Sequence, residues 1–123
     1  MKSSKDYMEE ANAAVTRIPG GEAISKHGTD AVFVDVRDSA SIAKTGTIAG
    51  AVRVPRGMME FAADPATDFH NKALQKDANI YLVCGAGGQA ALAGKTLKDM
   101  GYENVTNIGG IGEWKDANGP MEE

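Results

Sequence analysis

Cysteine is nearly absent from this chain of 123 residues, which contains one cysteine, one tryptophan and two histidines. The single cysteine, Cys84, cannot form an internal disulfide, and with only His27 and His70 beside it the chain lacks the ligand spacing of a zinc site. We therefore expect no metal and no organic cofactor, and any chemistry at Cys84 is that of a free thiol.

Long hydrophobic runs and an excess of basic residues are also missing. No window approaches the roughly 18 apolar residues of a membrane-spanning helix, and the N-terminal segment MKSSKDYMEEANAAV lacks the apolar core of a signal peptide. We therefore expect no membrane partner and a cytoplasmic location. The formal net charge of −4 argues against a nucleic-acid partner, because such proteins need a basic face against the phosphates.

The composition, with 42% hydrophobic and 24% charged residues, is that of an ordinary globular protein, and its length suits one domain over residues 1–123. Apolar residues from Tyr7 to Ile18 recur at intervals of three and four, which predicts an amphipathic helix ended by Pro19. We therefore divide the domain into an N-terminal helical extension, residues 1–19, and a core, residues 20–123.

The rest of the chain alternates short apolar segments with helical ones. Strands are predicted over residues 31–36, 50–55, 79–84 and 103–108. Helical segments are predicted over 22–28, in pieces over 58–76, over 89–100 and after 109–114. The helix over 89–100 is expected to present Leu92, Thr96 or Leu97, and Met100 on one face. Such alternation predicts βαβ units and a mostly parallel sheet with helices on both faces.

The glycine-rich turn after the strand over 79–84 resembles two nucleotide-binding patterns. Gly85, Gly87 and Ala90 match G-x-G-x-x-A between a strand and a helix. However, a dinucleotide fold begins at this strand and needs several more βα units than the remaining chain allows. The sequence GKT over 94–96 imitates the end of a phosphate-binding loop, but Gln89 stands where that pattern requires glycine.

The position of Cys84 favours a thiol in an anion-binding loop. It lies at the carboxyl end of a predicted parallel strand, where ligands bind in open sheets. The small residues after it let backbone N–H groups converge near the sulfur, and the positive end of the next helix favours the thiolate. A lone cysteine after a buried strand is often only a small core residue. Here the adjacent glycines favour a reactive nucleophile instead.

Four motifs in order resemble the rhodanese-like single-domain sulfurtransferases over residues 19–120: FVDVRD, GTIAGAVRVP, VCGAGGQA, and GGIGEW with NGP. The resemblance implies a three-layer α/β sandwich with a mostly parallel central sheet. It implies that Cys84 takes sulfane sulfur from a donor such as thiosulfate, as a persulfide, and passes it to cyanide, a thiol or a protein acceptor. The loop amides implied to hold the substrate anion and outer sulfur belong to Gly85, Ala86, Gly87, Gly88 and Gln89.

Two departures from the family remove charge from the site: Thr47 replaces a frequent histidine, and Gln89 an arginine found in many members. Phosphatases that share this fold use a longer loop with an arginine, so phosphatase chemistry is not favoured. Arg56 and Arg37 are candidates to bind the substrate anion, although a solvated Arg56 and an ion-paired Arg37 are alternatives. Asp35 is expected to be structural. The alternative function is a rhodanese-like binding or regulatory module.

Overall fold

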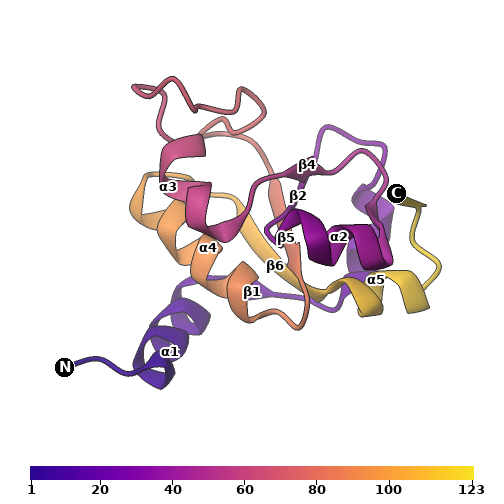
Figure 1. The fold of residues 1–123 in the computed structure, drawn as a ribbon, viewed down its shortest axis with the longest axis horizontal. Helices are drawn as coiled ribbons and strands as arrows, with labels where there is room; N and C mark the ends of the chain where they lie inside the picture. The colour runs from indigo at the N-terminus through magenta and orange to yellow at the C-terminus, as the bar shows by residue number, and fades with distance from the viewer.

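The protein is a three-layer α/β sandwich, shown by a computed structural model that describes residues 1–123 (Figure 1). Five strands form one parallel sheet in the order β1-β6-β5-β2-β4. The predicted fold class, a mostly parallel sheet covered by helices on both faces, is therefore confirmed. The strands of this sheet are β1 (Thr16–Arg17), β2 (Val32–Asp35), β4 (Val52–Arg53), β5 (Ile80–Cys84) and β6 (Val105–Gly110).

The helices and the remaining strands surround this sheet. The α-helices are α1 (Ser4–Ala14), α2 (Ser39–Thr45), α3 (Met59–Ala62), α4 (Gly88–Asp99) and α5 (Ile111–Asp116). Two 3-10 helices are η1 (Gly20–Lys26) and η2 (Arg56–Met58), and β3 (Thr47–Ile48) pairs antiparallel with β7 (Met121–Glu122). None of the helices combines the length and the apolar character needed to cross a bilayer.

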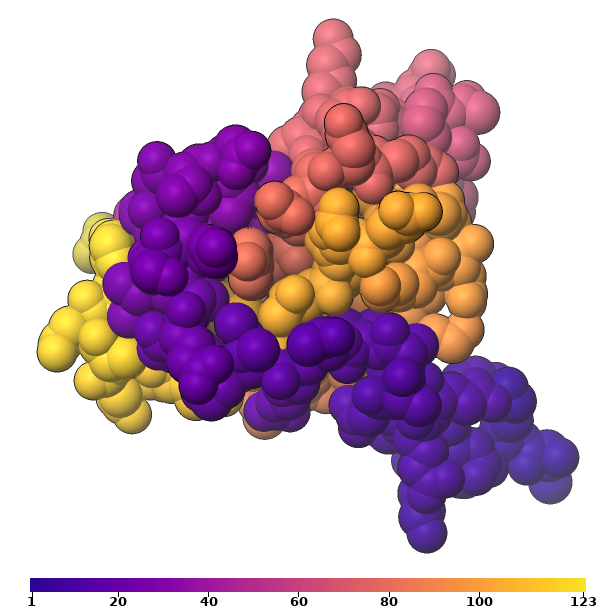
Figure 2. All heavy atoms as spheres, turned by 180° about the vertical axis from the view of Figure 1, so that it is seen from behind, coloured from indigo at the N-terminus to yellow at the C-terminus, as the bar shows by residue number.

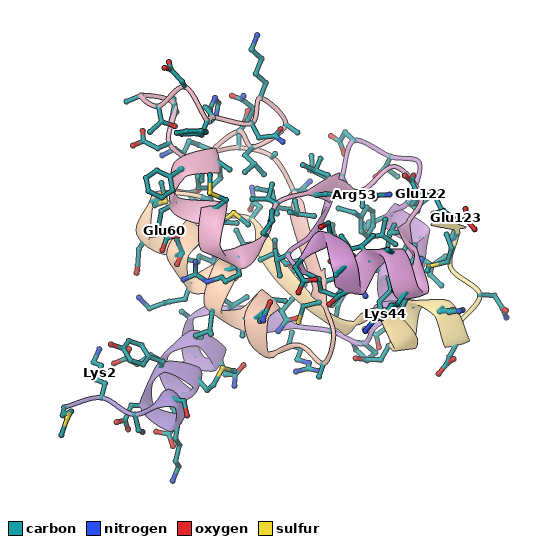
Figure 3. The ribbon with its side chains drawn as sticks, viewed as in Figure 1. Lys2, Lys44, Arg53, Glu60, Glu122 and Glu123 are labelled. Atoms are coloured by element: carbon teal, nitrogen blue, oxygen red, sulfur yellow. The ribbon has the colours of Figure 1, made fainter.

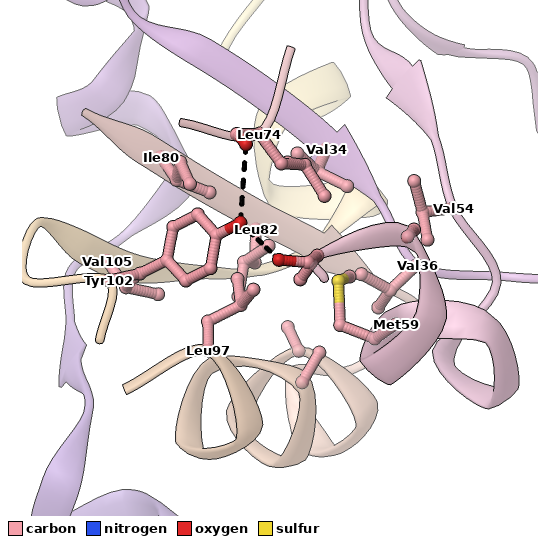
Figure 4. Packing of buried hydrophobic residues seen from close by; sticks show 14 of the residues in the cluster. Val34, Val36, Val54, Met59, Leu74, Ile80, Leu82, Leu97, Tyr102 and Val105 are labelled. Atoms are coloured by element: carbon pink, nitrogen blue, oxygen red, sulfur yellow. Dashed lines mark hydrogen bonds between the residues drawn. The ribbon is translucent and has the colours of Figure 1, made fainter. Parts of the chain in front are cut away.

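Alternate residues of the strands face two separate cores, as the period of two requires. On one face, Val34 and Leu82 pack with Met59 of α3 and Leu97 of α4. Figure 4 shows this core, in which the buried Tyr102 hydroxyl donates hydrogen bonds to the Ala63 and Leu74 carbonyls, so the loop before β5 is tied to the core.

The second core covers the opposite face of the sheet. Phe33 and Val83, one residue along from the pair above, pack against η1 and α5. The fully buried Trp114 stacks at a tilt on Phe33, with ring centroids 5.2 Å apart, and its indole N–H donates to the Pro120 carbonyl. The two cores hold the central strand β5 from both sides, so Cys84 at its end stands on a rigid platform.

The N-terminal helix is shorter than the sequence predicts. It ends at Ala14, and Thr16 and Arg17 form an edge strand beside β6 instead of continuing the helix to Ile18. The predicted strand over 50–55 also reduces to Val52–Arg53. At Thr16 and Arg17, strand pairing overrides the helical periodicity, because β6 offers an unpaired edge.

The core face of α4 agrees with the prediction at Leu97 but differs from it elsewhere. Leu92 and Met100 are half-buried, while Ala90, Ala93, Gly94 and Leu97 are fully buried. Gly94 lets the helix approach the sheet and α1: a methyl group there would lie 2.9 Å from Val15 and 3.3 Å from Leu82. Apart from Leu97, small residues thus form the buried face of α4, and a prediction from the spacing of large apolar residues does not identify them.

Candidate functional site

The loop that follows β5 places Cys84 at the carboxyl edge of the sheet. The pairing of β5 with β6 slips between Leu82 and Cys84, whose partners are Asn107 and Gly110. Such an irregularity re-aims side chains and is common beside active sites. It occurs where the chain leaves β5 to enter α4, so Cys84 lies directly below the N-terminus of a 12-residue helix.

The sulfur of Cys84 is buried and accepts two hydrogen bonds from backbone amides. The Gly87 N–H lies 3.0 Å from Sγ and the Ala90 N–H lies 3.3 Å from it. The residue is only 2% exposed. Two oriented N–H dipoles and the positive end of α4 therefore all face the sulfur, an arrangement that stabilises negative charge there.

Glycine is needed at Gly87 for a structural reason. This residue has φ of 102° and ψ of −13°, a left-handed conformation that side chains rarely adopt. A methyl group there would also collide with the Arg17 guanidinium. At Gly85 a methyl group would meet no atom within 4 Å, so that glycine is not required for space.

A cavity of about 320 Å³ opens beside the sulfur. The structure brings together there most of the site residues that the sequence predicts, with two others from the segment after β2. Its lining consists of Arg37, Asp38, Ser41, Cys84, Gly85, Ala86, Gly88 and Gln89. A small anion or a thiol-containing group fits a cavity of this size, and the roles of these residues in binding remain predictions.

Arg37 faces the cavity but its charge is already paired. Its guanidinium donates to the Asp35 carboxylate, with the closest contact at 2.7 Å, and both side chains are buried. Two further N–H groups of the guanidinium donate to the Thr45 hydroxyl and the Gly46 carbonyl. Thr47, which replaces the histidine frequent in the family, donates its hydroxyl to the same Asp35 carboxylate at 2.7 Å. Asp35 is therefore the common hydrogen-bond partner of Arg37 and Thr47, and its assignment as a structural residue stays a prediction.

Asp38, which the sequence analysis did not select, brings a negative charge to the cavity. Its side chain caps the N-terminus of α2 by accepting a 2.7 Å hydrogen bond from the Ser41 N–H. Hydrogen bonds from the Ser41 backbone and hydroxyl lower the pKa of the Asp38 carboxyl, so it is ionised at neutral pH. Its place directly after VDVR, at the carboxyl edge of the sheet, was the signal that could have revealed it.

Arg56 lies apart from the other predicted site residues. Its guanidinium donates to the Glu60 carboxylate at 3.0 Å and to the Thr96 hydroxyl at 3.1 Å, and it lines a second cavity between α1 and α4. It does not line the cavity beside Cys84. The assignment of Arg56 to anion binding stays a prediction that the geometry does not favour.

Arg17 of β1 is the cation that contacts the loop, and the sequence analysis missed it. Its Nη2 donates to the Ala86 carbonyl at 3.3 Å and lies 3.6 Å from the Glu113 carboxylate. Asn107 of β6 supports the next peptide by donating to the Gly87 carbonyl at 2.9 Å. Figure 2 shows α1 projecting from the molecule and the chain after it running along the surface. No local pattern links residue 17 to residue 86.

The match to a known family agrees with this geometry. The rhodanese-like domain model matches residues 21–117. The chain belongs to the rhodanese-like domain family. This confirms the resemblance noted in the sequence.

Two solved structures and one curated protein resemble this rhodanese-like domain. A protein of unknown function from Rhodopseudomonas palustris CGA009, described as a possible tyrosine phosphatase, has a TM-score of 0.91 and 36% identity, over 99% of this chain and 96% of that one. The Rhodanese_3-like domain of the Alr3790 protein from Anabaena has a TM-score of 0.65 and 29% identity, over 76% of this chain and 99% of that one. The adenylyltransferase and sulfurtransferase UBA4 of Meyerozyma guilliermondii is 32% identical over 73% of this chain.

The curated relatives are much longer proteins. The match covers 21% of the Meyerozyma guilliermondii protein and 10% of the Candida albicans protein of the same name. This domain therefore resembles only one part of those sulfurtransferases, and the activities of the whole proteins are not assigned to it.

Proposed function

We propose that this rhodanese-like domain is a sulfurtransferase that carries sulfane sulfur as a persulfide on Cys84. The observation that carries the proposal is the pair of amide N–H groups that point at the buried sulfur, next to an open cavity. A thiolate held by such donors attacks the outer sulfur of a donor molecule.

The reaction balances without a cofactor. The Cys84 sulfur forms a bond to the donor's outer sulfur, and the bond between that sulfur and the rest of the donor breaks. Its electron pair leaves with the remainder, which is sulfite when the donor is thiosulfate. A nucleophilic acceptor, such as cyanide, a small thiol or a protein thiol, then attacks the outer sulfur, and the electron pair of the breaking bond returns to Cys84.

The charges of the cavity bear on the donor. Arg37 is neutralised by Asp35, and Asp38 adds a negative charge. A dianion such as thiosulfate therefore meets amides and a helix dipole but no free cation. We expect a high KM for thiosulfate and a preference for polysulfides, persulfides or a protein donor with little negative charge.

Phosphatase chemistry is the activity that the Rhodopseudomonas palustris relative's description raises. A phosphoryl group carries charge on its equatorial oxygens that an enzyme must meet in the transition state. The loop from Gly85 to Gln89 has no basic residue, and the only arginine of the cavity is paired. These observations support sulfur transfer over phosphoryl transfer, and hydrolysis of p-nitrophenyl phosphate is the direct comparison.

Mass spectrometry tests the proposal. The intact protein is exposed to thiosulfate and separately to polysulfide, and the expected result is the addition of one sulfur atom at Cys84, removed by cyanide or a small thiol. Cys84→Ser is the control, because the hydroxyl keeps the shape but is not ionised at neutral pH. A mass unchanged with every sulfane donor would favour the alternative, a rhodanese-like binding or regulatory module.

A further inference from the structure

One peptide bond of the loop joins a cation to the sulfur. The carbonyl of Ala86 accepts a hydrogen bond from the Arg17 guanidinium at 3.3 Å, and the N–H of the same peptide, on Gly87, donates to Cys84 Sγ at 3.0 Å. The two groups bonded to this peptide thus lie on opposite sides of it. Arg17 makes no direct hydrogen bond to the sulfur, so any effect of its charge on the sulfur passes through this peptide.

The surroundings hold this peptide in one orientation. Gly87 adopts its left-handed conformation against the guanidinium. The following carbonyl, that of Gly87, is held by the Asn107 amide, whose oxygen in turn accepts the Gly109 N–H at 2.8 Å. Arg17 and Asn107 occupy paired positions of β1 and β6, so the edge strand brings the cation to the loop in register.

We propose that Arg17 is a positioning residue that supplies the charge-free loop with positive potential through the Ala86–Gly87 peptide. A cation on a carbonyl oxygen draws electron density from the amide and strengthens the hydrogen bond donated by its N–H, as in other chains of hydrogen bonds. The sulfur therefore receives a stronger donor than an isolated amide. The proposal deepens the proposed function, because a thiolate is the form that accepts sulfur.

Other charged groups near the site set the background against which Arg17 acts. The Arg37–Asp35 pair and the ionised Asp38 lie at the end of β2 and directly after it. From α5 comes Glu113, whose carboxylate lies 3.6 Å from the Arg17 Nη2 and also accepts the Gly110 N–H at 3.1 Å. Glu113 partly neutralises Arg17, and this predicts opposite effects for changes at the two residues.

The test measures the rate at which iodoacetamide, an uncharged reagent, alkylates Cys84 as a function of pH in the folded protein. Arg17→Gln is expected to react roughly three- to tenfold more slowly at neutral pH, with its rate profile moved to higher pH. Arg17→Lys, which keeps the charge, is expected to lie between this variant and the wild type. Glu113→Gln keeps an acceptor for the Gly110 N–H but removes the carboxylate charge, and is expected to react faster than the wild type.

Arg53→Gln is the matched control. Arg53 of β4 is 43% exposed against 47% for Arg17, and it pairs with Glu122 at 3.4 Å, beside which it lies in Figure 3. It is not among the residues that line the Cys84 cavity. Its alkylation profile should match that of the wild type.

Two results would overturn the proposal. The first is an Arg17→Gln variant that reacts like the wild type, or that slows equally at every pH, since uniform slowing indicates a purely structural role. The second is a Glu113→Gln variant that reacts no faster than the wild type, a result that is decisive even if Arg17→Gln fails to fold. Because alkylation requires no sulfur donor, these results are independent of persulfide formation, whose absence would count against the proposed function alone.

Discussion

Arg37 could stabilise the fold or bind the substrate, and measuring the stability and the persulfide formation of Arg37→Ala distinguishes these two roles. The side chain is 7% exposed, and it donates to Asp35, Thr45 and Gly46. Arg37→Ala leaves the fully buried Asp35 carboxylate with only two partners, the backbone N–H of residue 37, at 3.0 Å, and the Thr47 hydroxyl. An unpaired buried charge is the expected consequence.

The expected cost is large for a domain of this size. Breaking a buried ion pair by removing one partner costs about 3–5 kcal/mol, a substantial part of the roughly 5–15 kcal/mol by which domains are stable. The entropy of unfolding for 123 residues is about 0.26 kcal/mol/K, so the melting temperature should fall by about 12–19 °C. Urea denaturation monitored by tryptophan fluorescence measures the free energy of unfolding directly, because the single Trp114 lies in the second core.

Two further variants complete this prediction. Asp35→Asn combined with Arg37→Met removes both charges and should be more stable than Arg37→Ala alone, because no unpaired charge remains. Arg53→Ala breaks the half-exposed pair with Glu122 and should cost at most about 1 kcal/mol. A loss below about 1 kcal/mol in Arg37→Ala would refute this reasoning. If persulfide formation with thiosulfate then fell as well, Arg37 would be the substrate's cation.

Three other changes test the cavity and its loop. Asp38→Asn keeps an N-cap for α2 but removes a negative charge from the cavity. The kcat/KM for thiosulfate should therefore rise roughly three- to tenfold, whereas the kcat/KM for a neutral polysulfide donor should not change. Equal changes for both donors would contradict this prediction. Because hydrogen bonds from Ser41 lower the pKa of Asp38, its contribution to stability is present above the carboxyl's unfolded pKa and lost as the pH falls through the folded value. Thermal melts should therefore show a smaller acid-side loss in Asp38→Asn. Gln89→Arg, at an exposed position in the first turn of α4, should lower the KM for thiosulfate by up to about ten- to a hundredfold and make it sensitive to salt. An unchanged KM and salt dependence would mean that a cation already serves the site. Gly87→Ala should destabilise by about 1–3 kcal/mol in urea denaturation, because of its φ of 102° and the Arg17 contact, whereas Gly88→Ala, with helical backbone and open space, should be nearly neutral or stabilising.

Local patterns were sufficient to predict the architecture and the position of Cys84. The strands β2 and β5 fall within predicted apolar segments, and β6 overlaps the segment over 103–108 but continues to Gly110. Cys84 lies at the carboxyl edge of the sheet, as expected. Both inferences rest on near neighbours in the chain: buried parallel strands must be apolar on both faces, and a glycine turn between a strand and a helix exposes amide groups. The resemblance to rhodanese-like domains was carried by motifs of the same local kind.

The charges around the sulfur could be decided only by the tertiary structure. The motif placed Arg37 near the site and left an ion pair with Asp35 as an alternative. The structure decides for the pair, because the guanidinium folds back to the Asp35 carboxylate and the partly buried Gly46 carbonyl. Arg17 reaches the loop because the chain after α1 adds an edge strand beside β6, although the period of three and four predicted more helix there. Strand pairing depends on which edge is free in the folded sheet, and the contacts of Arg17 with Ala86 and Glu113 join residues remote in the chain. Neither leaves a periodic trace in the sequence, so the electrostatics of the site emerge only when the chain is folded.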